Sequence, residues 1–235
     1  SSTPTWLARM RAPVDARGLA VFRILFGLLG TVSALRFMAY GWIDELFVRP
    51  SFFFHYWGAS WVRPLPPAGM HALFPALAGL GLCVSLGLFY RVSVVLFTAG
   101  WTYVQLCDLT NYLNHYYFVS WLGLLMALLP LHKTWSLDAT LRPSLRASTL
   151  PAWCLGLLRF QVGVVYTYAG VAKLTGDWLI HAQPLDIWLS SRTSLPLLGS
   201  LLAHPAAPLL MSWAGCLFDL SIVGFLLHRR TRAWA

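Results

Sequence analysis

The chain has 235 residues, of which 58% are hydrophobic and only 11% are charged, and its mean hydropathy is +0.64. Ordinary globular proteins carry about 25% charged residues, so this composition excludes a soluble core and indicates a polytopic membrane protein of one domain, residues 1–235. The formal charge of +9 does not indicate a nucleic-acid partner, because no basic run is interleaved with aromatic residues and no nucleic-acid-binding motif is present.

Six apolar stretches predict an all-α bundle of about six transmembrane helices. A straight span needs roughly 20 residues, so the third and fourth stretches are short, and we expect them to extend through Asp108–His115 at the membrane edge. The stretches are approximately Leu19–Tyr40, Met70–Phe89, Val92–Cys107, Tyr116–Leu131, Trp153–Lys173 and Ala206–Leu227.

Basic residues gather on alternate connections between these stretches. The positive-inside rule therefore places both termini and these connections in the cytoplasm, and the other connections on the outer side. Two outer connections, Gly41–Gly69 and Leu174–Pro205, are aromatic but too polar to span, and are predicted to be interfacial segments. The basic residues are Arg9, Arg11, Arg17, Arg91, Lys133, Arg142, Arg146, Arg229, Arg230 and Arg232.

Two groups of polar residues are predicted on the outer side. The first, Asp108, Asn111, Asn114 and His115, follows the third stretch, and in helical register Asp108, Asn111 and His115 share a face. The second group lies at the end of the fifth stretch and contains Lys173, Asp177, Trp178 and His181. It continues the helical face of Arg159, Val162, Tyr166 and Gly170. We expect both groups to line one pocket that a quinone or a lipid headgroup reaches from the bilayer.

Lys173 has two interpretations. In a dry site, desolvation would lower the pKa of its amine and make it available as a base. At the end of a membrane helix, it can instead extend its ammonium to the headgroups or pair with Asp177 four residues later. Arg23 and Arg36, near opposite ends of the first stretch, are expected to reach the headgroups in the same way.

The other polar residues also have simpler roles. Asn111 and Asn114 are suited to cap a helix, Asp108 to be an ordinary loop carboxylate, and His115 and Tyr117 to lie at the interface. No metal-ligand spacing appears among the Cys, His, Asp and Glu residues, so we expect no metal.

Six sequence blocks occur in an order that points to a known family. Together they resemble the vitamin K-dependent γ-glutamyl carboxylase and its bacterial relatives, the HTTM family. The blocks are PVD with LAVFRILFG (residues 13–15 and 19–27), RPLP with LGLFYRVSVVLF (63–66 and 86–97), DLTNYLNHYY (108–117), WSLD (135–138), YAGVAKLTGDW (168–178) and LFDLS (217–221).

This resemblance implies an enzyme of a bacterial inner membrane that couples epoxidation of vitamin K hydroquinone by O2 to carboxylation of glutamate by CO2. Lys173 matches the family's base, and Asn114 and His115 match its asparagine–histidine pair, on the periplasmic side. We expect His115 to be catalytic with Lys173, no metal cofactor, and, as partners, membrane lipid or quinone and a glutamate-containing peptide or small acceptor. The residues expected to bind substrate are Asp108, Asn111, Asn114, Tyr117, Asp177 and Trp178.

The animal carboxylase continues into a large extramembrane domain, so this chain is expected to be a core fragment or a minimal member. Two other functions therefore stay open: a hydroquinone epoxidase or oxidase without protein carboxylation, and a non-catalytic transport or assembly protein. A transporter is expected to place ionisable groups deep in several spans. Here they gather near one face, which favours the enzyme.

Overall fold

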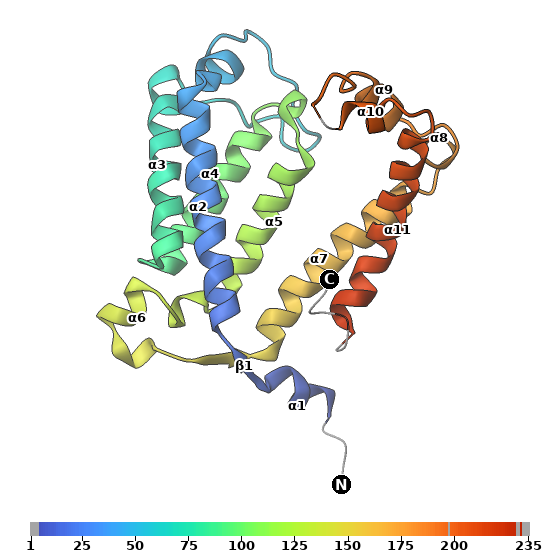
Figure 1. Cartoon of the computed structure of the whole chain (residues 1–235). Coiled ribbons are helices and arrows are strands. Elements are labelled where there is room, and N and C mark those ends of the chain that lie inside the picture. The colour runs from blue at the N-terminus through green and yellow to red at the C-terminus, as the bar shows by residue number, and fades with distance from the viewer. Residues whose placement is uncertain (1–4, 197, 229–230, 232–235) are drawn as a thin grey trace. The chain divides into compact units, whose positions relative to one another are not determined.

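The computed structural model describes residues 5–196, 198–228 and 231 and divides into two compact units, Ser1–Leu157 and Leu158–Ala235. A helix forms at each of the six predicted stretches (Figure 1). Within the described residues, four of these helices are long and apolar enough to cross a membrane, namely α2, α3, α7 and α11. The six are α2 (Arg17–Ala39), α3 (Pro67–Leu86), α4 (Tyr90–Leu106), α5 (Asn114–Leu128), α7 (Ala152–Ala172) and α11 (Ala207–Leu227).

Helices α4 and α5 have only 17 and 15 residues, and the predicted extension through Asp108–His115 is wrong for most of its length. After Leu106 the chain forms a separate 3-10 turn, Leu109–Asn111, and then extends through Tyr112 and Leu113 before α5 begins. Six helices are therefore present at the predicted places, and the number of membrane crossings stays a prediction.

Short elements lie in the connections between the long helices. Two of them are strands that form one small sheet, so the prediction of an all-α fold was not fully correct. Strands β1 (Pro13–Asp15) and β2 (Thr149–Pro151) pair antiparallel, with Val14 opposite Leu150, and fasten the N-terminal segment to the chain that precedes α7. The other elements are α1 (Trp6–Arg11), a π-helix at Asp44–Val48, 3-10 turns at Leu131–Lys133 and Pro143–Leu145, α6 (Leu137–Leu141), α8 (Gly176–Leu179), α9 (Leu185–Ser190) and α10 (Gly199–Leu202).

The core of the first unit is an aromatic cluster between closely packed helices. The ring of Phe37 on α2 stacks on Phe74 of α3 at 5.0 Å between centroids, and Trp101 of α4 lies edge-on to Phe37 at 6.4 Å. A Cβ added to Gly27 would lie 2.5 Å from the carbonyl oxygen of Gly81, so only glycine allows α2 and α3 to approach this closely.

Arg23 on α2 is fully buried, so the prediction that it extends to the headgroups is wrong. Its guanidinium donates to the carbonyl oxygens of Val84 at 3.1 Å and Ser85 at 2.8 Å, and also to that of Trp135. Val84 and Ser85 end α3, where the last carbonyls lack helical partners and the helix dipole favours a cation. Arg23 is therefore a C-terminal cap supplied by a neighbouring helix.

The WSLD block completes this end of the unit. The Ser136 hydroxyl accepts from the Ala139 amide and caps α6, while the Asp138 carboxylate accepts from the amides of Phe89 and Tyr90, both at 2.9 Å, where α4 begins. Because a carboxylate at a helix N-terminus satisfies free amides and complements the dipole, the block fixes α6 to the start of α4.

Candidate functional site

In the second unit, α7 and α11 pack along two glycines. A Cβ added to Gly170 would lie 2.7 Å from the Leu220 side chain and 3.1 Å from its backbone nitrogen, and one added to Gly163 would lie 3.4 Å from Val223. Small residues let membrane helices approach closely in this way. The approach places Asp219 of α11 opposite the end of α7, where Lys173 follows.

Lys173 forms an ion pair with Asp219. The Lys173 ammonium donates to Asp219 Oδ2, and the two side chains are only 22% and 13% exposed. Charges removed from water are stable only when they are paired and hydrogen-bonded, so this contact accounts for both residues at an apolar helix–helix surface. The interpretation that Lys173 only extends its ammonium to the headgroups does not agree with this ion pair.

The alternative pairing of Lys173 with Asp177 is wrong. Helix α7 ends at Ala172, and α8 begins at Gly176 after Thr175, whose hydroxyl accepts from the Trp178 amide at 3.3 Å. Lys173 and Asp177 thus do not share a helix, the expected common face ends with α7, and the Asp177 side chain is exposed. A signal for Asp219 was present in the sequence, since it is a single carboxylate within an apolar stretch, and such a residue needs a partner.

Trp178 closes the other side of the lysine. The Lys173 Nζ atom lies 5.2 Å from the centroid of the Trp178 ring, within the range of a cation–π contact. The Trp178 indole donates to the carbonyl oxygen of Ser212 at 2.9 Å, and the buried Ser212 hydroxyl donates back to the Trp178 carbonyl. These bonds fix α8 on α11, so Lys173 lies between a carboxylate and an aromatic face that are both held in place.

Asp108, in the first unit, has a structural role. Its carboxylate accepts from the Thr110 amide at 2.9 Å and from the Phe54 amide at 3.4 Å, and the residue is buried. It caps the 3-10 turn and holds the loop that contains Phe54. Because the chain leaves helical geometry here, the prediction that Asp108, Asn111 and His115 share a helical face is wrong.

Asn114 and His115 are the first two residues of α5, and both are exposed. The alternative that Asn114 caps a helix is not observed, since the N-cap is Leu113 and no side chain caps α5; Asn111 ends the 3-10 turn. The His115 ring contacts Tyr116 edge-on at 4.7 Å. Within the described part of the chain, the side-chain amide of Asn114 and the imidazole of His115 have no hydrogen-bond partner. Both side chains are therefore free to bind another group.

A groove of about 400 Å³ runs between α4 and α5. Among its lining residues, Gln105 donates to the Ser120 hydroxyl at 2.8 Å, and Thr102 donates to the same hydroxyl at 3.0 Å. Burial raises the pKa of the Tyr56 hydroxyl above its usual value. Of the predicted site residues, Tyr117 lines this groove; the lining is Tyr56, Thr98, Thr102, Gln105, Leu106, Tyr117, Ser120, Trp121 and Leu124.

The predicted site residues thus fall into two sets. Asp108, Asn111, Asn114, His115 and Tyr117 belong to the first compact unit, and Lys173, Asp177 and Trp178 belong to the second. The structure brings Trp178 to Lys173 and adds Asp219 to them. The meeting of His115 with Lys173 in one pocket stays a prediction.

The four long apolar helices within the described residues are consistent with an integral membrane protein. The family model of the HTTM domain matches residues 11–235, nearly the whole chain, and the protein belongs to this family. No solved structure matches the chain.

Proposed function

We propose that this protein is a membrane enzyme that deprotonates a hydroquinone of the vitamin K type and epoxidises it with O2, with Lys173 as the base. The observation that carries the proposal is the pairing of Lys173 with Asp219 at an apolar surface. An ammonium cannot accept a proton, so Lys173 acts as a base only after its proton has moved to another group. Asp219 is the acceptor to which that ammonium already donates.

We infer the following path for the proton. With its proton on Asp219, the neutral Lys173 amine removes a proton from the hydroquinone oxygen, which leaves an oxyanion that reacts with O2. Overall, hydroquinone and O2 give epoxide and water. Where a glutamate-type acceptor is present, the strong base formed on the way to the epoxide removes its γ-proton, and the carbanion attacks CO2 to give the second carboxylate.

Two features of the first unit support the hydroquinone as substrate. Asn114 and His115 have free hydrogen-bonding groups suited to a phenolic oxygen or its oxyanion. The groove between α4 and α5 is apolar with a few polar groups, as expected of a site for an aromatic ring with a hydrocarbon tail. The remaining predicted substrate contacts, Asn111, Asp177 and Trp178, are proposed because they belong to the two polar groups predicted on the outer side.

The proposal is tested by incubating purified protein with vitamin K hydroquinone and O2 and measuring epoxide by chromatography. Incorporation of labelled CO2 into a glutamate peptide, measured in the same samples, separates a carboxylase from an epoxidase. Epoxide that forms at the uncatalysed rate would end the proposal and would leave the transport or assembly role.

A further inference from the structure

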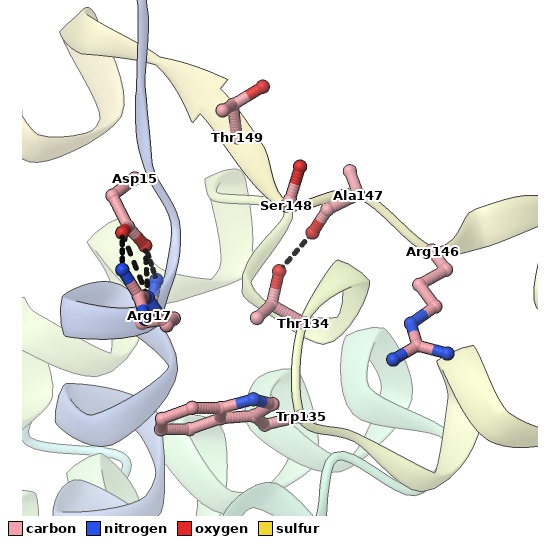
Figure 2. A pocket seen from close by; sticks show the side chains of 8 residues that line it. All are labelled: Asp15, Arg17, Thr134, Trp135, Arg146, Ala147, Ser148 and Thr149. Carbon is pink, nitrogen blue, oxygen red and sulfur yellow. Dashed lines mark hydrogen bonds and ion pairs between the residues drawn. The ribbon is translucent and has the colours of Figure 1, made fainter.

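We propose that a pocket beside the β1–β2 sheet binds the phosphate group of an anionic phospholipid. The pocket has a volume of about 430 Å³, lies within the first unit, and contains none of the residues that we assign to the hydroquinone reaction. It is formed where the chain enters α2 and where the connection after α6 returns to β2. Its lining is Asp15, Arg17, Thr134, Trp135, Arg146, Ala147, Ser148 and Thr149 (Figure 2).

Several donors in this pocket are free. Among the described residues, the Arg146 guanidinium, the Ser148 hydroxyl and the Trp135 indole N–H have no hydrogen-bond partner. The Thr134 hydroxyl is used, since it donates to the carbonyl oxygen of Ala147, as Figure 2 shows. A guanidinium suits the oxygens of a phosphate, and a hydroxyl and an N–H elsewhere in the same lining can add hydrogen bonds.

The acidic residue in the pocket is neutralised within the protein. Asp15 accepts three side-chain hydrogen bonds from Arg17, at 3.1, 2.8 and 2.5 Å, and this guanidinium holds the pKa of the Asp15 carboxyl below its usual range. The pair carries no net charge and does not repel an anion. Arg146 therefore supplies the uncompensated positive charge.

The surroundings favour a lipid phosphate over a soluble one. The pocket lies at the start of α2, and the next turns of this helix expose the apolar side chains of Val21 and Leu25. Trp135, which lines the pocket, is itself 57% exposed. Arginine beside tryptophan at the end of an apolar helix is typical of the headgroup level of a bilayer. A phosphate held in the pocket would leave its acyl chains beside the apolar surface of α2.

The charge around the pocket is mainly positive. Arg91 near the start of α4, and Lys133 and Arg142 on the connections, lie at this end of the unit. The Asp138 carboxylate there accepts from the amides that begin α4. Basic residues next to membrane helices attract anionic lipids by about 1 kcal/mol each. The site is therefore expected to select phosphatidylglycerol over phosphatidylcholine, which has the same phosphate but no net charge.

The test is lipid binding to the purified protein in a neutral detergent, measured by native mass spectrometry. Phosphatidylglycerol is expected to bind more tightly than phosphatidylcholine, and Arg146→Gln to weaken that binding about fivefold, as the loss of one basic contact implies. Ser148→Ala should weaken it by a smaller factor. Arg142→Gln is the matched control, because it removes the same charge from the same connection but does not line this pocket, so it should weaken phosphatidylglycerol binding less than Arg146→Gln does.

Three outcomes would overturn the proposal. Equal weakening by Arg142→Gln and Arg146→Gln would indicate diffuse attraction to a basic surface. Equal binding of the two lipids would remove the selectivity for net charge. If inorganic phosphate displaced bound phosphatidylglycerol at an equal molar concentration, the site would bind a soluble anion as well as the lipid, and the proposed preference for a lipid phosphate would be wrong. Because Arg146 and Ser148 are exposed, neither variant is expected to alter folding, and unchanged thermal unfolding without lipid checks this.

Discussion

Lys173 donates a hydrogen bond to Asp219, a residue 46 positions later in the chain, and this ion pair joins the end of α7 to α11. Both side chains are largely shielded, and the Trp178 ring lies 5.2 Å from the ammonium. Such a pair compensates two charges that are largely removed from water, and it keeps an ammonium and a carboxylate in hydrogen-bond contact.

Asp219→Asn is expected to abolish epoxidation while leaving the protein folded. The amide still accepts a hydrogen bond from Lys173, but it cannot take up the lysine proton, so the amine stays blocked. Loss of a proton-transfer group typically lowers a rate by about 10²–10⁴-fold, which chromatography of the epoxide would show. Asp186→Asn, an exposed residue on α9 of the same unit, is the control and should keep wild-type activity. Full activity in Asp219→Asn would separate the ion pair from the chemistry.

Gly170→Ala is expected to weaken the contact between α7 and α11. The new methyl group would lie 2.7 Å from the Leu220 side chain, and such overpacking typically costs about 1–3 kcal/mol. The shift of α11 should also move Asp219 away from Lys173, so thermal stability and activity should fall together. Gly215→Ala is the matched control on α11, because nothing lies within 4 Å of its added Cβ. If both variants unfold like the wild type, the close approach at Gly170 contributes nothing.

Arg23→Met is expected to destabilise the first unit. The carbonyl oxygens of Val84, Ser85 and Trp135 lose their donor, and a buried unsatisfied carbonyl costs about 1–3 kcal/mol. At about 2–4 °C per kcal/mol for a chain of this length, the Tm in detergent should fall by roughly 5 °C or more. Arg36→Met, an exposed arginine of the same helix that lies over Trp42, is the control and should shift the Tm little. Equal shifts would restore the view that Arg23 only reaches the headgroups.

The positions of the six long helices were predictable because continuous apolar stretches and helical length are local properties of the sequence. The boundaries after α4 and α7 were not. The Asp108 and Thr175 side chains each accept a hydrogen bond from a backbone amide a few residues later. These bonds compete with the backbone bonds that would continue the preceding helix, so a new turn or helix begins at each residue. Extrapolated helical faces therefore failed at both places.

The candidate site was predicted only in part for a similar reason. Lys173 and Trp178 lie close together in the chain, so one sequence block contains both. The partner Asp219 lies on another helix, and its contact depends on how α7 and α11 pack at Gly170. Arg23 shows the same limit, because its three acceptors come from the end of α3 and from Trp135, which no pattern within α2 indicates.

Lys173→Ala and Lys173→Arg together test whether the residue is a base. Lys173→Ala should abolish epoxidation, and a small added amine should restore part of it by entering the vacated space.

Lys173→Arg is the more decisive variant. Like an ammonium, a guanidinium forms a strong ion pair with a carboxylate. The contact with Asp219 and the thermal stability should therefore persist. However, arginine cannot be deprotonated in a protein, so it cannot accept the hydroquinone proton, and epoxidation should fall as far as in Lys173→Ala. A purely structural lysine predicts the opposite, a stable variant with nearly full activity. Measuring Tm and epoxide on the same preparation distinguishes these outcomes, and equal activity in wild type and Lys173→Arg would remove Lys173 as the base even though the family assignment would stand.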